Sequence, residues 1–184
     1  AAGTPENVLR GAGSTVFTAA WEASEHAKVP LVIDRAEQEI EEGNCVAIFV
    51  TFTAPRIARM EHFKTTCGIF GGQNQRDRDE AIAAFQADRR RVIVCQIKAG
   101  STGVSLHDLH GNHPRVSSIL PSNSPDDMTQ AFGRIHRNAG LTKCRQYVPY
   151  AAGTMEEEIC ARVRGKIGNM GALNDGDTDP AAIF

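Results

Sequence analysis

Two arginines in the last third of the chain have types and spacing suited to binding phosphate. They lie in the segment Gln130-Ala-Phe-Gly-Arg134-Ile-His-Arg137. On a helix, Gln130, Arg134 and Arg137 are spaced i, i+4, i+7 and project from one face. The guanidinium fork matches phosphate oxygens in a bidentate way. A solvated basic face is the alternative interpretation, but the small and apolar residues between the arginines indicate a closely packed helix.

A glycine-rich turn from Lys98 to Gly103 offers a second place where an anion can bind. It contains Gly100 and the hydroxyl residues Ser101 and Thr102. Backbone amides in such a turn can surround an anion, and hydroxyl groups can donate to phosphate. The residue order is not that of a Walker A loop. A tight strand-to-helix connection without a ligand is the other interpretation of this segment.

Four residues that can bind metal follow this turn closely: His107, Asp108, His110 and His113. Histidine and aspartate are common metal ligands. No two histidines here are spaced i, i+4 on an expected helix, and the segment is typical of a polar loop. We therefore expect no metal site.

The composition is that of an ordinary globular domain. The chain has 184 residues, of which 41% are hydrophobic, and its net charge of −2 gives no overall basic field to attract nucleic acid. The five cysteines are scattered without a C-x-x-C pair, which predicts a reducing, intracellular compartment such as the cytoplasm, the nucleus or their infected-cell equivalent. Because no apolar run approaches the roughly 20 residues that span a bilayer, we expect no membrane partner.

Helical and strand-like patterns alternate along the chain. Apolar runs predict strands at 45–50, 67–70, 91–96, 116–120 and 146–150. Helical signals fall at 14–25, 30–42, 55–63, 74–87, from Ser124 onward and at 155–167. The alternation predicts one α/β domain with a mostly parallel sheet and helices on both faces.

The domain is expected to span residues 14–167. Both ends of the chain are rich in glycine and small polar residues, so 1–13 and 168–184 are expected to be flexible tails. The chain begins with Ala1 and not with methionine, which suggests a piece of a larger protein.

The carboxyl edge of the predicted sheet is where ligands should bind, because ligands of parallel α/β sheets lie outside the carboxyl ends of the strands. The segments that follow these ends are Thr51 to Thr53, Gly71 to Gln73, Lys98 to Gly103 and Pro121 to Ser124. We expect the functional residues to gather there.

With these segments placed, the chain resembles the second RecA-like lobe of superfamily 2 helicases and DNA translocases. Residues 46–52 look like motif IV, 71–85 like the segment that follows it, and 98–106 like motif V. Residues 130–137 match motif VI, Q-x-x-G-R-x-x-R. Residues 103–107, 120–124 and 153–159 are similar to the Swi/Snf-type and strawberry-notch-like branch.

The resemblance implies an ATP site shared between two lobes. An N-terminal RecA-like lobe would hold the phosphates and most of the contacts to Mg²⁺. The present lobe would supply Arg134 and Arg137 as arginine fingers with Gln130 in support, and Gly100, Gly103 and Gly133 would lie at the nucleotide. Since neither a Walker A loop nor a D-E-x-H motif occurs in the chain, we expect it to be inactive as an ATPase alone.

The resemblance also implies a track for DNA or RNA. The expected contacts to the nucleic-acid backbone are Thr51, Thr53, Gly72, Gln73, Ser101 and Thr102. Backbone amides and hydroxyl groups make such contacts without reading sequence.

Two other functions fit the same residues. A stand-alone module on a RecA-like fold could bind nucleic acid or protein without nucleotide hydrolysis, although it would have no need for both arginines. A small α/β hydrolase could use His107 or Asp108, although no nucleophile with a base is evident in the sequence.

Overall fold

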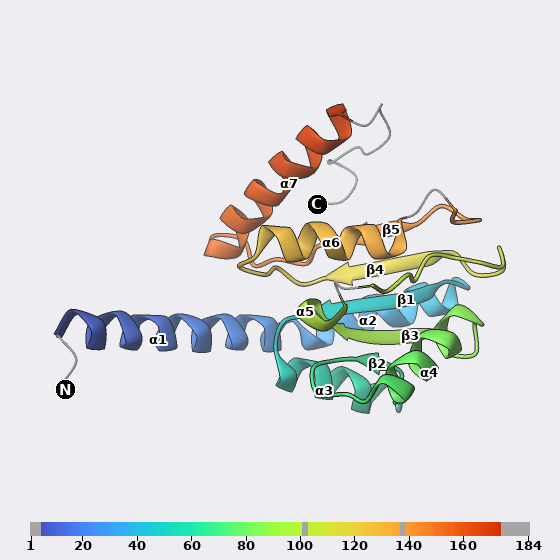
Figure 1. The fold of residues 1–184 in the computed structure, drawn as a ribbon, viewed down its shortest axis with the longest axis horizontal. Helices are drawn as coiled ribbons and strands as arrows, with labels where there is room; N and C mark the ends of the chain where they lie inside the picture. The colour runs from blue at the N-terminus through green and yellow to red at the C-terminus, as the bar shows by residue number, and fades with distance from the viewer. Residues whose placement is uncertain (1–4, 101–102, 137–138, 174–184) are drawn as a thin grey trace.

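A five-stranded sheet forms the centre of the molecule (Figure 1). The computed structural model describes residues 5–100, 103–136 and 139–173. The strands are β1 (Cys45–Val50), β2 (Gly68–Ile69), β3 (Val92–Gln96), β4 (Arg115–Ile119) and β5 (Arg145–Tyr147). Their order in the sheet is β2-β3-β1-β4-β5, and every pairing is parallel, as the alternation of helices and strands predicted.

Seven helices surround this sheet in the described parts of the chain. They are α1 (Pro5–Ala27), α2 (Val29–Glu41), α3 (Thr53–His62), α4 (Gln75–Gln86), α5 (Ile97–Gly100), α6 (Pro125–Ile135) and α7 (Met155–Leu173). None of them has the length and apolarity needed to cross a bilayer.

The central strand β1 explains why helices cover both faces of the sheet. All six of its residues are buried. Val46 and Ile48 face a cluster that includes Val32 of α2, with Met60 of α3 packed against it. Phe49 faces the larger cluster on the opposite side, to which α1, α4, α6 and α7 contribute. A strand that is apolar on both faces is stable only when both faces are covered, so the predicted architecture is confirmed.

The ends of the chain differ from the sequence-based expectation. Residues 1–13 were expected to form a flexible tail, yet α1 begins at Pro5 and runs without a break to Ala27. Proline suits the first turn of a helix, and Gly11 and Gly13 weaken a helix by about 1 kcal/mol each without ending it. Similarly, α7 extends to Leu173, beyond the expected limit at 167.

Helix α6 begins as its sequence predicts and ends earlier than expected. The Ser124 hydroxyl accepts a hydrogen bond from the Asp127 amide at 3.2 Å, and Pro125 occupies the first turn. The helix ends at Ile135, and His136 is extended with ψ of 110°. The expected continuous helix through Arg137 is therefore wrong, and Arg137 lies outside the described residues. Asn138 and Gly140, which follow, are poor helix formers.

Truncation of a buried side chain in the central strand should lower the stability of the domain. Phe49 is fully buried, so Phe49→Ala removes its packing and leaves a cavity, which is expected to lower the free energy of unfolding by about 3–5 kcal/mol. Urea denaturation followed by circular dichroism measures this. Leu31→Ala, at a side chain that is 60% exposed on α2, is the matched control and should change stability by no more than about 0.5 kcal/mol. Equal effects of the two substitutions would contradict the placement of β1.

Candidate functional site

The carboxyl ends of β1, β2 and β3 are tied together by one side chain, Gln96. Its Oε1 accepts a hydrogen bond from the Gly71 amide at 3.2 Å, and its Nε2 donates to Thr53 Oγ1 at 3.1 Å. The turn after β2 and the first turn of α3 therefore lie side by side. The structure brings Thr53 and Gly72 together at this edge, where the topology of a parallel sheet places ligands.

The Gly71–Gln73 turn is braced by its own residues. Gln73 donates from Nε2 to the Gly68 carbonyl at 3.1 Å, and its Oε1 accepts from the Phe70 amide at 3.4 Å. Gly72 has a φ of +78°, which favours glycine, and the space where a Cβ would lie is open. In this arrangement Gln73 shapes the turn, while the backbone at Gly72 stays accessible.

The end of β1 already has an anionic partner that the sequence did not reveal. The Thr51 amide donates to both carboxylate oxygens of Glu25, at 3.1 and 3.0 Å, and the Phe52 amide donates to Oε1 at 3.1 Å. Burial raises the pKa of Glu25, and the Phe52 and Thr51 amides and the positive charge of Arg59 oppose that rise. Glu25 belongs to α1, and no local signal near Thr51 points to a partner so distant in sequence.

The glycine-rich segment after β3 starts as a short helix and not as a turn. Helix α5 covers Ile97–Gly100, and Arg78 of α4 donates to the Ala99 carbonyl at 2.9 Å. Gly103 is exposed with a φ of +67°. Ser101 and Thr102, two of the expected contacts to nucleic acid, lie outside the described residues.

Two hydrogen bonds join helix α6, which carries Arg134, to the loop after α5. Arg134 Nη1 donates to the Val104 carbonyl at 3.2 Å, and the Leu106 amide donates to the Arg134 carbonyl at 2.8 Å. Because of these contacts Arg134 is half-buried. Gln130 and Gly133 are exposed, and no atom lies within 4 Å of where a Cβ of Gly133 would be.

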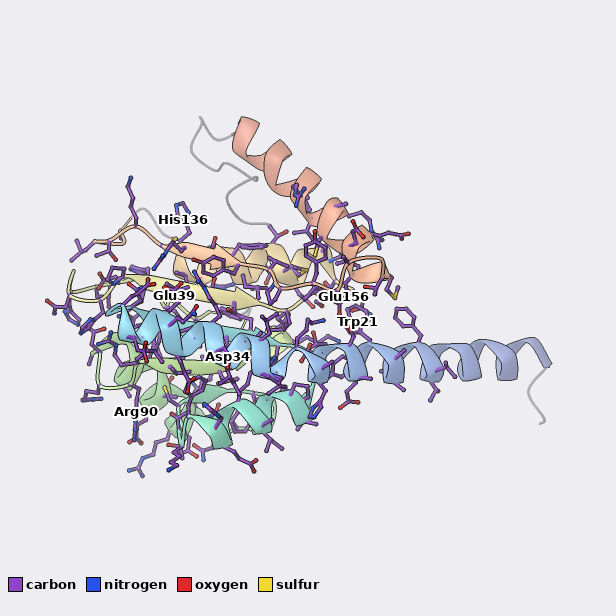
Figure 2. The ribbon with its side chains drawn as sticks, turned by 180° about the vertical axis from the view of Figure 1, so that it is seen from behind. Trp21, Asp34, Glu39, Arg90, His136 and Glu156 are labelled. Atoms are coloured by element: carbon purple, nitrogen blue, oxygen red, sulfur yellow. The ribbon has the colours of Figure 1, made fainter. Side chains whose placement is uncertain are left out.

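The arginine helix ends away from the carboxyl edge, which corrects a second expectation. Helix α6 starts after the carboxyl end of β4 and runs back over the sheet. Gln146 of β5 pairs with Ser117 in the middle of β4 and donates to the Phe132 carbonyl at 2.9 Å. Figure 2 accordingly shows His136 at the opposite end of the sheet from Trp21 and Glu156. Arg134 therefore lies on a different surface from Thr53 and the turn at Gly72.

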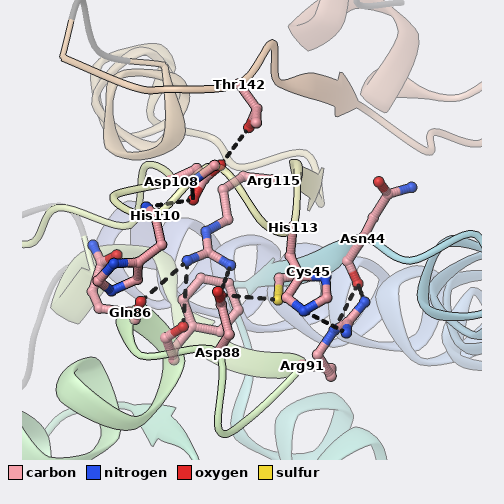
Figure 3. A network of polar contacts seen from close by, with 12 residues as sticks. Asn44, Cys45, Gln86, Asp88, Arg91, Asp108, His110, His113, Arg115 and Thr142 are labelled. Carbon is pink, nitrogen blue, oxygen red and sulfur yellow. Dashed lines mark hydrogen bonds and ion pairs between the residues drawn. The ribbon is translucent and has the colours of Figure 1, made fainter.

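Asp108, His110 and His113, which were considered as metal ligands or hydrolytic groups, make structural contacts within the domain (Figure 3). Asp108 is buried and accepts hydrogen bonds from the amides of His110 and Gly111 and from the Thr142 hydroxyl. Burial alone would raise the pKa of Asp108, but these three donors outweigh it and hold the pKa below the usual aspartate value. No group of three or more potential ligands that could hold a metal ion occurs in the described ranges.

Loss of the Asp108 carboxylate should loosen this loop. Asp108→Ala leaves two amides and a hydroxyl without their acceptor, so the free energy of unfolding is expected to fall by about 1–3 kcal/mol. The folded-state pKa is depressed, so the contribution is present above about pH 4 and is lost as the pH falls further. Chemical denaturation as a function of pH measures both effects. Thr142→Val removes only one donor and should cost less, and a larger loss for Thr142→Val than for Asp108→Ala would contradict the assignment.

Comparisons with known proteins agree on the class of domain. Residues 28–139 match the model of the helicase conserved C-terminal domain. A protein of Acanthamoeba polyphaga mimivirus that carries the name of an ATP-dependent RNA helicase is 37% identical over 153 residues, which are 83% of this chain and 28% of that protein. The crystal structure of the C-terminal part of the Fun30 ATPase domain aligns with a TM-score of 0.55 at 23% identity, over 65% of this chain and 39% of that one. At that identity the likeness concerns the fold alone.

Proposed function

Because this chain belongs to the family of helicase conserved C-terminal domains, we propose that it is the C-terminal RecA-like lobe of an ATP-dependent nucleic-acid helicase or double-strand DNA translocase of superfamily 2. The observation that carries the proposal is the attachment of Arg134 to the loop at Val104 and Leu106. It joins the two segments that the family resemblance assigns to nucleotide and to nucleic acid. The chain spans 28% of the length of its mimivirus relative, so the complete activity requires parts that this domain does not contain.

The surface of α6 fits a triphosphate held by a second lobe. Gln130 is exposed, and the open space at Gly133 lets a large anion approach the helix closely. Arg134 is held at a fixed position by its bond to Val104. ATP bound with Mg²⁺ on an N-terminal RecA-like lobe would supply the phosphoryl group. Arg134 and Arg137 would stabilise its charge, and Gln130 would orient it.

The carboxyl edge of β1, β2 and β3 fits the backbone of a nucleic acid. Thr53 and the turn at Gly72 lie together there. Ser101 and Thr102, which the family resemblance assigns to the same contacts, lie outside the described residues. These groups suit phosphate and sugar and do not distinguish DNA from RNA. The name of the mimivirus relative favours RNA, and the scattered free cysteines suit a reducing, intracellular compartment.

Without its partner lobe, the chain should not hydrolyse ATP. It lacks both the phosphate-binding lysine loop and the acidic metal-binding motif, so the triphosphate would have no complete site. Phosphate release from the purified chain, with and without an oligonucleotide, tests this. Joined to an N-terminal lobe of its own protein, it should show turnover that nucleic acid stimulates. Sustained hydrolysis by the isolated chain, free of contaminants, would contradict the proposal.

Removal of either arginine should abolish turnover in the two-lobe protein. Arg137→Ala and Arg134→Ala are each expected to lower kcat by about 10³–10⁵ if they act as arginine fingers. Arg134→Ala also removes the bond to Val104 and should cost about 0.5–1.5 kcal/mol of stability. Steady-state kinetics together with thermal unfolding separate these effects.

Arg90→Ala is the matched control for these substitutions. Arg90 is exposed and lies far from His136 across the molecule (Figure 2). The Arg90→Ala substitution removes the same charge and should leave kcat within a factor of about two, since distant surface substitutions have small effects. Near-normal turnover in both arginine-finger variants would reject the arginine-finger assignment.

A further inference from the structure

The carboxylate of Glu25 sits where a helix and a strand present donors to an anion. Glu25 is fully buried, and its carboxylate accepts hydrogen bonds from the backbone amides of Thr51 and Phe52. These two amides immediately precede α3, whose N-terminus carries a partial positive charge. The amides that would bind a phosphate oxygen at the end of β1 therefore hold a carboxylate from α1.

Arg59 adds a second observation that points to an anion at this place. Its side chain is fully buried, and only Nη1 has a protein acceptor, the Pro55 carbonyl at 2.9 Å. Nε and Nη2 have no hydrogen-bond partner among the described residues. Burial lowers the pKa of Arg59 to about 10, and the Glu25 carboxylate opposes that change. A buried guanidinium with unused donors is costly, and an anion with more oxygens than a carboxylate would satisfy it better.

Helix α1 is held against the end of β1 by contacts other than those of Glu25. Trp21, one turn before Glu25, is buried and meets the Phe52 ring edge-on at 6.5 Å. Directly after α1, Lys28 forms an ion pair with Glu156 of α7 at 2.5 Å, and Ser24 of α1 donates to the same carboxylate. The match to the family domain begins at residue 28, so α1 lies in front of the matched region.

Beyond the proposed function, on which this inference rests, we propose that Glu25 is an internal substitute for a nucleic-acid phosphate. While α1 is docked, Glu25 blocks a phosphate site formed by the Thr51 and Phe52 amides, at which the positive charge of Arg59 also acts. When α1 detaches, a backbone phosphate occupies the site, next to the Thr53 hydroxyl. Docking of α1 and binding of nucleic acid at β1 are then mutually exclusive, because two anions cannot share the same amides.

The chain contains its own reporter for this exchange. Trp21 is the single tryptophan and is 7% exposed, so its emission reports whether α1 is docked. A single-stranded oligothymidylate and the corresponding oligouridylate are titrated into the purified chain. Binding is followed by the anisotropy of a labelled strand. Release of α1 is followed by a red shift of the Trp21 emission and by its quenching with acrylamide. We expect the emission shift to follow the same isotherm as binding.

Glu25→Gln removes the negative charge of the side chain and keeps its size and shape. Glutamine can still accept from the amides, so folding is expected to persist, but the competing charge is lost. Affinity for the oligonucleotide should rise about fivefold or more. The slope of log affinity against log salt concentration should become steeper by the amount that corresponds to about one additional phosphate contact. Glu22→Gln, at a half-buried residue of the same helix, removes the same charge away from the amides and should have a smaller effect.

The outcomes distinguish this inference from the function on which it rests. Binding without a change in Trp21 emission, or equal effects of Glu25→Gln and Glu22→Gln, would overturn the exchange at β1 and leave the nucleic-acid function standing. Absence of binding to either oligonucleotide, in wild type and in Glu25→Gln, would overturn both. The wild-type emission measurement needs no substitution, so an unstable variant does not prevent a decision.

Discussion

The two hydrogen bonds between Arg134 and the loop at Val104 and Leu106 fix the position of helix α6 relative to the segment that follows β3. Helix α4 contacts the same loop, since Gln86 donates to the Ser105 carbonyl, and it also contacts α5, since Arg78 donates to the Ala99 carbonyl. Helices α4 and α6 are thus joined through a segment that has little regular structure of its own. If ATP acts on α6 and nucleic acid acts at the strand ends, this segment is the physical path between them.

Local patterns in the sequence were enough for the sheet and not enough for the site. The apolar run of β1 predicts a strand covered on both faces, and Ser124-Pro125 predicts the start of α6, because each signal depends on neighbouring residues. The contact of Glu25 with Thr51 depends on how α1 returns to the sheet, which no periodicity records. The direction of α6 likewise decides that Arg134 lies away from the carboxyl edge, whereas the spacing of Arg134 in the sequence predicts only that it binds an anion.

The two helices outside the core of the family match are linked to each other. Glu156 at the start of α7 accepts from Lys28, from Ser24 and from the Ala151 amide, and Lys28 follows α1 directly. A buried ion pair of this kind is specific in geometry and costly to leave half-formed. Detachment of α1 would therefore leave the Glu156 carboxylate without two of its donors, which connects any change at β1 with the base of α7.

Because α1 is long, a small change where it is attached produces a large displacement at its far end. The helix has 23 residues and is docked near one end only, with the rest extending past the sheet (Figure 1). At 1.5 Å per residue it is roughly 35 Å long, so a tilt of about 10° at the docked end would displace the far end by about 6 Å. A rigid arm of this kind magnifies a sub-ångström rearrangement around one carboxylate into a movement as large as a side chain.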